Sequence, residues 1–352
     1  MTINNERLQT IISEQLQPVA KKVDEEAYYA EAFLYTLGKE GFFSSDGKTE
    51  ANYLLDEALV VQEIAKVCMT TAFCCWCHLA ALTYLRKSDN EFLKTTILPK
   101  LENGELLGAT GLSNPMKFYA GLERLHLKAE KVEGGYIING VLPAVSNLGE
   151  NHYFGAIASL DDHEVMVLVS TEHSDVVLKE QAHFIGVNGS ATYACRFTNA
   201  FIADDFVIAH DAAPFVDIIR PAFIYYQVPL GIGVIESSIE GIEKVKAKQN
   251  GCNEFLVTQG CTLQATADEL QQTLRDVTTS GLTLPAVVAL RRQSVYDTLD
   301  AVQANMIHNG AAGYVEGSVP YRKLREAYFF ANLTPTVRQL EKMTTKLALQ
   351  TK

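Results

Sequence analysis

The sequence predicts an α+β protein of three successive domains: a helical domain over residues 1–104, a β-domain over residues 105–210 and a helical bundle over residues 211–352. Two observations predict this order. Hydrophobic residues recur at spacings of three and four in the first and last parts, as in amphipathic helices, but alternate with polar residues in the middle, as in strands. A chain of 352 residues is long enough for two or three domains of ordinary size.

The helical pattern of the first domain is clearest shortly before residue 70. Its hydrophobic stripe consists of Val60, Val61, Ile64, Val67 and Cys68. The following run, residues 74–78, has the composition of a metal site (Cys-Cys-Trp-Cys-His) but not its geometry. Consecutive side chains of a helix point about 100° apart, so only Cys74 and His78 share a face. Two ligands do not form a closed metal site, and we therefore expect a buried helix without a metal.

The middle domain begins with a predicted β-hairpin. Leu125, Leu127 and Ala129 alternate with polar residues, and a Gly134-Gly135 turn separates them from a second hydrophobic run. Residues 165–169 and 193–202 have the same strand-like composition. The sequence therefore predicts several strands in this part of the chain.

The last domain returns to helical spacing. A Gly-x-Gly at residues 231–233 lacks the third glycine and the preceding strand of a dinucleotide fingerprint, so we expect a closely packed helix there. Residues 281–285 are expected to form a turn between two later helices. The hydrophobic stripes of those two helices are Leu263, Ala267, Leu270, Leu274 and Val277, and then Val295, Leu299, Val302 and Met306.

The composition argues against several classes of partner. The net charge is −12 and no cluster of Lys and Arg is present to neutralise a row of phosphates, so no nucleic acid is expected. The most apolar window, residues 223–235, is broken by Gln, Pro and Gly, so no membrane span is expected. The N-terminus lacks the pattern of a signal peptide, and seven irregularly spaced cysteines indicate a reducing compartment. We therefore expect a cytoplasmic protein.

Short motifs follow one another through the middle and the end of the chain. Residues 112–115 and 144–147 are predicted to be two short loops that carry hydroxyl groups, and residues 184–192 form a glycine-containing loop. Residues 309–314 form a glycine-rich turn, which residues 324–327 follow. In this order and spacing, the motifs resemble the acyl-CoA dehydrogenase family over nearly the whole chain. The resemblance implies a helical N-terminal domain, a β-barrel-like middle domain and a C-terminal four-helix bundle.

The resemblance also implies FAD as the cofactor. A flavin ring needs an apolar surface along one edge and short hydrogen-bonding groups along the other. Ser113 matches a family hydroxyl residue at the polar edge of the ring, and Ser146 matches a second one near N5. In the family the cofactor lies across a subunit boundary, so we expect a homodimer or homotetramer. The cofactor-binding residues implied in this way are Leu112, Ser113, Ala144, Ser146, Asn147, Gly310, Gly313 and Thr336.

The chain departs from the family pattern at two cofactor contacts. Ala144 stands where many members have an aromatic residue that packs on the flavin. The arginine with which members often bind the cofactor phosphates of a neighbouring subunit has no clear counterpart, and Lys246 and Lys248 are the nearest cations. A lysine is a point charge without the fork of a guanidinium.

The catalytic base is the largest departure. The family reaction removes a proton next to a thioester, which requires a carboxylate within hydrogen-bond reach. Thr334 occupies the usual position of that glutamate, and Ile219 occupies the second known position, directly before Arg220. Asp217, three residues before Arg220, is a candidate base, although an ion pair with Arg220 is the simpler interpretation. Glu236 is another candidate, for which a solvated position is the simpler interpretation. Arg220 itself is expected to orient the group that faces the substrate.

The function predicted from the resemblance is α,β-dehydrogenation of an acyl-CoA thioester, with hydride transfer to flavin N5. Because the base is missing, two alternatives stay open. One is a flavin-dependent monooxygenase of the same fold, and the other is a catalytically silent relative that binds an acyl group or a partner protein. No residue in the sequence identifies the acyl chain or the electron acceptor.

Overall fold

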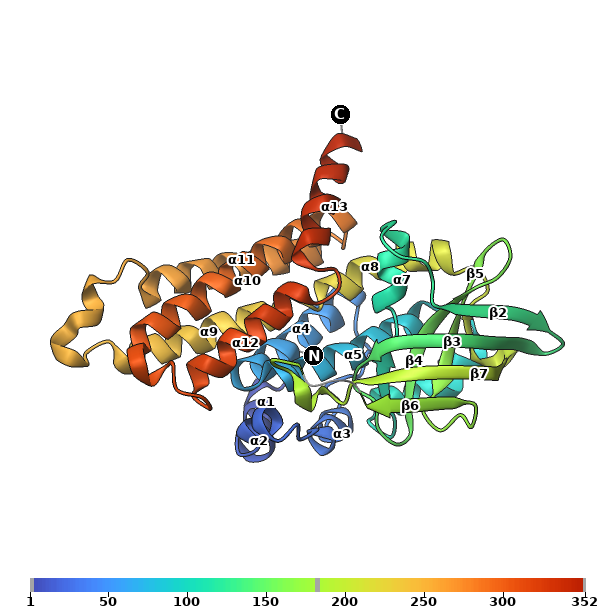
Figure 1. The fold of residues 1–352 in the computed structure, drawn as a ribbon, viewed down its shortest axis with the longest axis horizontal. Helices are drawn as coiled ribbons and strands as arrows, with labels where there is room; N and C mark the ends of the chain where they lie inside the picture. Colours follow the sequence, from blue (N-terminus) through green and yellow to red (C-terminus); the bar gives the residue numbers. More distant parts are fainter. Residues whose placement is uncertain (1–2, 181–183, 351–352) are drawn as a thin grey trace.

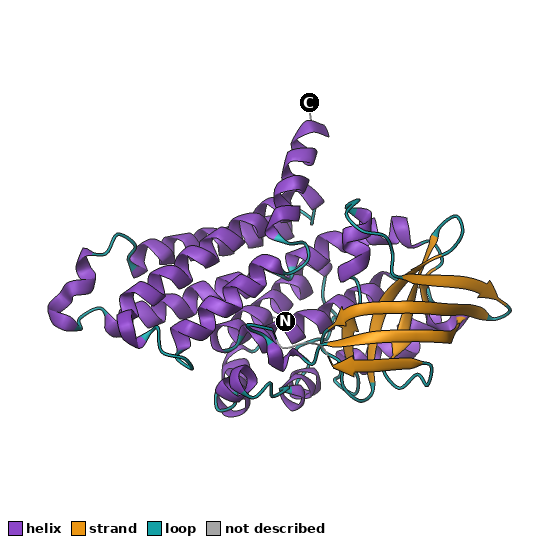
Figure 2. Ribbon diagram, viewed as in Figure 1, coloured by secondary structure: helices purple, strands orange, loops and turns teal. Residues whose placement is uncertain are grey.

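The computed structural model describes residues 3–180 and 184–350, and its architecture is the predicted α+β order. Figure 1 shows the sheet at one end of an elongated molecule, the helical bundle at the other, and the first helices beside their junction. Figure 2 separates the two kinds of structure clearly, with all strands gathered at one end. The junction between sheet and bundle is therefore the place where residues from all three domains meet.

The N-terminal domain is built around two long helices. Thr49 caps the first of them, because its hydroxyl accepts a hydrogen bond from the Asn52 N–H at 3.3 Å. The second is buried from Met69 to Leu85 and includes the cysteine-rich run, as predicted. Among the described residues no cluster of three or more potential metal ligands occurs. The helices are α1 (Asn5–Ile11), α2 (Ala20–Glu25), α3 (Glu31–Lys39), α4 (Glu50–Val67), α5 (Met69–Lys87) and α6 (Leu98–Glu102).

The β-domain is one mixed sheet in the order β6-β7-β3-β2-β4-β5-β8, with β1 paired to β4. The predicted hairpin is confirmed: Val132 pairs with Gly135, which leaves a two-residue turn in which Gly134 has a φ of +76°. Inward residues such as Leu127 and Ile138 form the core of the sheet. The strands are β1 (Leu107–Thr110), β2 (Leu127–Val132), β3 (Gly135–Val145), β4 (His152–Ser159), β5 (Glu164–Ser170), β6 (Val176–Glu180), β7 (Tyr193–Ala203) and β8 (Val207–Ala209).

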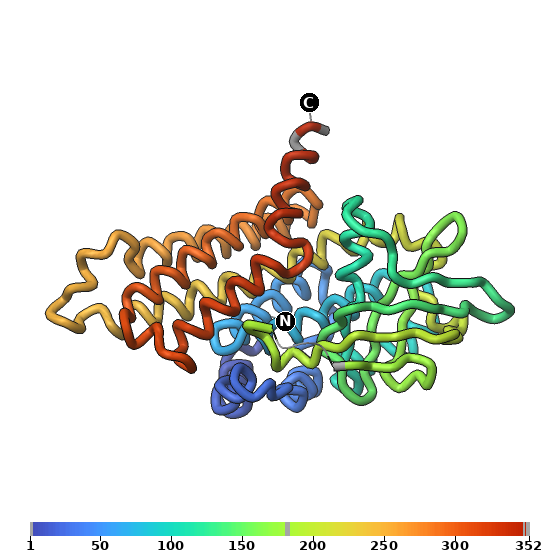
Figure 3. The backbone as a smooth tube through the Cα atoms, in the orientation of Figure 1, coloured from blue at the N-terminus to red at the C-terminus, as the bar shows by residue number. Residues whose placement is uncertain are grey.

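The C-terminal helices form the bundle. The predicted stripe of α10 is buried at Leu263, Ala267, Leu270 and Leu274. In Figure 3 the last helix leaves the bundle and projects past the junction with the β-domain, so that the C-terminus lies far from the N-terminus. The helices are α8 (Ala212–Tyr225), α9 (Val228–Val245), α10 (Gly260–Thr279), α11 (Leu284–Asn309), α12 (Val319–Asn332) and α13 (Val337–Gln350).

One helical stretch, residues 212–245, is long and apolar enough to cross a membrane by length and composition alone. Most of its apolar window is buried inside the molecule, where α8 and α9 pack against other helices. Its hydrophobicity is therefore accounted for by the protein core.

The prediction of two hydroxyl-bearing loops was wrong in part. Ser113 begins a short helix, α7 (Ser113–Tyr119), and Ala144 lies in strand β3. The helix tolerates Pro115 because the first four N–H groups of a helix have no partner within it. Leu112, Ser146 and Asn147 lie outside helices and strands, and Ser146 pairs with Thr110 as an isolated bridge.

Candidate functional site

A cavity of about 680 Å³ lies between the β-domain and the helices, and we call it the interdomain cavity. Its volume is within the usual range for small-molecule sites. Segments far apart in the sequence meet around it: α5, the two serine-bearing segments of the β-domain, the loop before β7, α8 and the end of α12. Its lining is Phe73, Trp76, Cys77, Thr110, Ser113, Ala144, Ser146, Phe184, Ile185, Gly186, Val187, Ser190, Thr192, Phe223, Tyr328, Phe329, Asn332, Leu333 and Thr334.

Hydroxyl groups form two pairs at the polar side of this cavity. Ser113 Oγ lies 3.2 Å from Thr334 Oγ1, which joins the start of α7 to the segment after α12. Ser146 Oγ lies 2.7 Å from Thr192 Oγ1, which lies 2.8 Å from Ser190 Oγ. Because a hydroxyl both donates and accepts, each pair retains hydrogen-bonding capacity for a ligand.

Thr110 links the two serine-bearing segments. It ends β1, pairs with Ser146, and its hydroxyl accepts a hydrogen bond from the Leu112 N–H at 3.3 Å. The buried Tyr84 hydroxyl lies 2.7 Å from the same oxygen. Helix α5 therefore holds the end of β1 in place, and this end in turn positions the segments that carry Ser113 and Ser146.

Aromatic side chains form another part of the cavity lining. Trp76 stacks on Phe73 with ring centroids 5.5 Å apart and meets Phe223 edge-on at 4.9 Å. The Trp76 indole N–H donates to the Phe223 carbonyl at 3.0 Å, which holds the ring in place. Burial raises the pKa of the adjacent Cys77 thiol well above its usual value, so this sulfur stays protonated.

The loop at residues 184–192 covers one rim of the cavity. Asn188 accepts from the Phe184 N–H and donates to the Phe184 carbonyl, both at 2.8 Å, which closes the loop on itself. Arg325 on α12 donates to the Ile185 carbonyl at 2.9 Å and forms an ion pair with Asp24. The Ile185 side chain is nevertheless 74% exposed, so the rim presents an apolar surface to solvent.

The lining fits a flavin ring. Phe73, Trp76 and Phe223 offer an apolar surface, and the pairs formed by Ser113 and Ser146 offer short hydrogen-bonding groups. The small Ala144 leaves space at the position where family members place an aromatic residue, and the three aromatic rings of α5 and α8 supply apolar surface instead. The lining therefore offers both kinds of contact that a ring with one apolar and one polar edge needs.

Two predicted cofactor residues do not line the interdomain cavity. Leu112 is fully buried in the hydrophobic core. Asn147 is also fully buried: its amide donates to the Gly108 carbonyl at 2.8 Å and accepts from the Tyr29 hydroxyl at 2.7 Å. Both side chains therefore hold the fold around the serines.

Three further residues that the resemblance implied for cofactor binding, Thr336, Gly310 and Gly313, are also absent from the lining of this cavity. Thr336 caps α13, with its N–H donating to Gln339 Oε1 at 2.6 Å. Gly310 and Gly313 follow α11, whose 26 residues extend for about 39 Å, and Leu284 at the start of that helix is on the β-domain side. Within one chain the turn thus lies at the far end of the bundle, and contact with a cofactor would require a second subunit.

None of the described residues that line the interdomain cavity is a carboxylate. Asp217 forms the ion pair that was the simpler interpretation: its carboxylate lies 2.6 Å from the Arg220 guanidinium, and its side chain is 70% exposed. Arg220 lines a second cavity. Glu236, another carboxylate on the bundle, lies 3.0 Å from Lys66. The described cavity therefore has no evident base.

A buried relay behind Thr334 was not predicted from the sequence. Arg291 Nε donates to Gln227 Oε1 at 2.9 Å, and Gln227 Nε2 donates to the Thr334 carbonyl at 2.9 Å. Arg291 also donates to the Phe330 carbonyl at 2.8 Å, and burial without a carboxylate partner lowers its pKa to about 9. The sequence contained one indication that Arg291 is buried: it stands four residues before Val295, on the same face of the helix as a hydrophobic stripe.

Comparisons with known proteins agree with this architecture. Residues 5–105 match the family described as acyl-CoA dehydrogenase, N-terminal domain. Benzylmalonyl-CoA dehydrogenase of Aromatoleum aromaticum is 23% identical over 198 residues, which cover 54% of this chain and 52% of that protein. Acryloyl-CoA reductase (NADH) of Anaerotignum propionicum is 30% identical over 145 residues, which cover 38% of this chain and 36% of that protein. The matches thus span about half of the first relative and about a third of the second.

Solved structures extend the similarity of fold to almost the whole chain. Glutaryl-coenzyme A dehydrogenase in complex with glutaryl-CoA superposes with a TM-score of 0.88 at 15% identity, over 99% of this chain and 94% of that chain. PigA with FAD and proline superposes with a TM-score of 0.86 at 16% identity, over 99% of both chains. Residues 5–105 thus match the N-terminal domain of the acyl-CoA dehydrogenases, and the fold of nearly the whole chain is similar to that of solved acyl-CoA dehydrogenase structures.

Proposed function

We propose that this chain is a flavin-dependent oxidoreductase that binds FAD in the interdomain cavity and acts on an acyl thioester. The observation that carries the proposal is the cavity itself, whose lining combines paired hydroxyls with aromatic rings at the junction of the sheet and the bundle. The relatives named above are a dehydrogenase and a reductase of CoA thioesters, and one solved neighbour contains FAD.

The residues of the chain have separable tasks in this proposal. Bound FAD would supply an acceptor for one hydride, that is, for two electrons and a proton. Ser113 and Ser146 hydrogen-bond the polar edge of the ring, and Phe73, Trp76 and Phe223 exclude water from its apolar edge. The acyl group occupies the remaining apolar volume near Leu333.

Dehydrogenation between the α and β carbons is the first candidate reaction, because the curated relatives act on CoA thioesters by redox chemistry. The described lining lacks a carboxylate to take the α-proton, which favours a second candidate. A flavin monooxygenase needs no α-base, since it uses reduced flavin to activate oxygen. A silent binding protein is the remaining alternative.

Anaerobic titration of the FAD-loaded chain with acyl-CoAs of different lengths separates these candidates. Bleaching of the flavin band is the result expected for dehydrogenation. A flavin that stays oxidised with every thioester, but consumes oxygen once reduced and then oxygenates an added substrate, supports the monooxygenase. A flavin that does neither contradicts both enzymatic assignments.

We also propose a homodimer or homotetramer in a reducing cytoplasm. Exposed apolar side chains surround the glycine-rich turn: Ile307, Tyr314 and Val315 are 61%, 85% and 61% exposed. Such a surface favours contact with a second copy. All seven cysteines are free, which agrees with a reducing compartment.

A further inference from the structure

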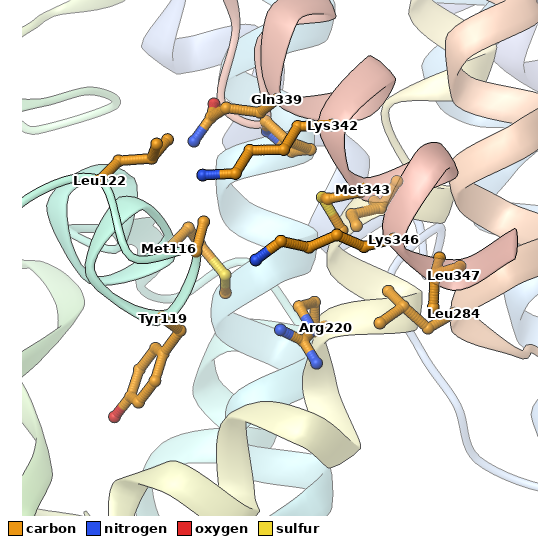
Figure 4. Close-up of a pocket in the computed structure, with 13 residues that line it drawn as sticks. Met116, Tyr119, Leu122, Arg220, Leu284, Gln339, Lys342, Met343, Lys346 and Leu347 are labelled. Atoms are coloured by element: carbon orange, nitrogen blue, oxygen red, sulfur yellow. The ribbon is translucent and has the colours of Figure 1, made fainter. Parts of the chain in front are cut away.

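A second cavity, of about 290 Å³, lies beside the first, and we call it the lysine cavity. It is enclosed by α7 and the turn after it, by α8, by the start of α11 and by α13. Figure 4 shows that the side chains of α13 and α8 face those of α7 across it. Its lining is Met116, Tyr119, Ala120, Leu122, Arg220, Ile224, Leu284, Pro335, Gln339, Lys342, Met343, Lys346 and Leu347.

Three cations point into the lysine cavity, and no carboxylate lines it among the described residues. In Figure 4 the ammonium groups of Lys342 and Lys346 extend toward Met116, and the guanidinium of Arg220 lies below them. Asp217 neutralises part of the Arg220 charge from an exposed position. Neither lysine forms an ion pair with any residue that the structure describes.

The spacing of the two lysines brings two positive charges close together. Lys342 and Lys346 are four residues apart on α13, so they occupy one face of the helix and repel each other. An anion with two adjacent negative groups would relieve this repulsion and would pair with both ammonium groups. The walls beside them, formed by Met116, Ile224 and Met343, are apolar. The ligand therefore combines a polyanion with an apolar or flat group.

The position of the lysine cavity relative to the first one restricts its ligand further. Ser113 and Thr334 line the interdomain cavity, whereas Met116 and Pro335, three residues and one residue further along the chain, line the lysine cavity. The contact between Ser113 and Thr334 thus lies at the boundary of the two sites. One elongated ligand is able to occupy both, with its reactive end among the serines and its anionic part among the lysines.

We propose that Lys342 and Lys346, together with Arg220, bind the pyrophosphate of an ADP-bearing ligand whose reactive end lies in the interdomain cavity. This inference rests on the proposed function, in which two such ligands occur: FAD and coenzyme A. It assigns the phosphate-binding cations to α13 of the same chain, in place of Lys246 and Lys248 at the end of α9.

The test measures binding and not turnover. Lys342→Gln, Lys346→Gln and the double variant are titrated with FAD, FMN, riboflavin, coenzyme A and pantetheine by equilibrium dialysis. Arg338→Gln is the matched control, because it removes one exposed positive charge from the same helix outside the cavity lining. All substituted side chains are exposed, so circular dichroism should show unchanged folding.

The double variant is expected to bind one ADP-bearing ligand roughly tenfold more weakly, and with a shallower salt dependence, than Arg338→Gln. A loss of FAD affinity with unchanged riboflavin affinity assigns the site to the cofactor. A loss for coenzyme A with unchanged pantetheine binding assigns it to the substrate.

Two further outcomes separate this inference from the proposed function. If the wild-type chain binds FAD and coenzyme A, but neither affinity differs between the double variant and the control, the inference is overturned while the proposed function stands. If the wild-type chain binds no flavin, yet coenzyme A binding depends on the two lysines, the proposed function fails while the inference is supported.

Discussion

Thr334 Oγ1 lies 3.2 Å from Ser113 Oγ, so the residue in the position of the family base contacts a residue predicted to hold the flavin. Thr334 is buried, and its carbonyl is held from behind by Gln227. The segment that would carry a base is therefore held close to the proposed cofactor position. What it lacks is a group that can accept a proton.

Thr334→Glu should restore that group. A carboxylate at this position is expected to increase the rate of anaerobic flavin reduction by an acyl-CoA by on the order of 100-fold, the usual contribution of a general base. Thr334→Gln is the control, because it has the same size without the basic carboxylate. Equal rates in the two variants, measured by stopped-flow absorbance, would show that the substrate α-carbon does not lie beside this position.

The two serines should contribute to flavin affinity. Ser113→Ala and Ser146→Ala each remove one hydrogen-bonding group, and each is expected to weaken FAD binding about fivefold, which corresponds to about 1 kcal/mol. Ser13→Ala serves as the control, because it removes an exposed hydroxyl that donates only to the Thr10 carbonyl. Dissociation constants from flavin fluorescence decide the matter, and serine variants that bind like the control would refute the assignment.

The Arg291–Gln227 relay should stabilise the fold. Arg291→Met leaves Gln227 Oε1 and the Phe330 carbonyl without their donor, and we expect the free energy of unfolding to fall by about 3 kcal/mol. The neighbouring Arg292→Met removes only a half-exposed ion pair with Glu341 and should cost less than about 1 kcal/mol.

A double-mutant cycle tests the coupling within that relay. The Arg291→Met/Gln227→Leu variant removes donor and acceptor together, so its loss in urea unfolding should be smaller than the sum of the two single losses by about 1 kcal/mol or more. Strictly additive losses would mean that the two side chains are not coupled.

His78 should make the stability depend on pH. Burial, with smaller contributions from His152 and Arg86, lowers the pKa of His78 from 6.5 to about 3, and its Nδ1 accepts the Gly108 N–H at 2.9 Å. Below pH 6.5 the unfolded chain binds a proton that the folded chain does not, so stability is present above this pH and falls as the pH drops toward 3.

His78→Asn keeps an acceptor near the Gly108 N–H but does not titrate. Between pH 7 and pH 5 the wild-type chain should therefore lose about 2 kcal/mol more unfolding free energy than this variant. Parallel losses in the two proteins, measured by urea denaturation at each pH, would mean that His78 does not carry the effect.

The sequence was sufficient for the order of the domains because the hydrophobic period changes from 3.6 to 2 and back. It also identified Ser113 and Ser146, which do line one cavity, although Ser113 lies on a helix that the loop prediction missed. Leu112 and Asn147 are adjacent to those serines in sequence, but their side chains point into the core. Adjacency in a motif does not determine which way a side chain points.

The lysine cavity and the relay were beyond such reasoning for a different reason. Lys346 and Arg220 are 126 positions apart in the chain and meet only because α13 leaves the bundle beside α8. The burial of Arg291 could not be predicted from its position alone, because a charged residue is expected to be solvated unless its buried partners, such as Gln227, are known.

Binding of FAD in the interdomain cavity can be followed directly, because the chain contains a natural fluorescent probe there. Trp76 is the only tryptophan in the sequence and lines that cavity. Titration of the apoprotein with FAD, with tryptophan emission as the readout, should show quenching that saturates at one FAD per chain and that is weakened in Ser146→Ala. Tryptophan emission that FAD leaves unchanged would contradict the account.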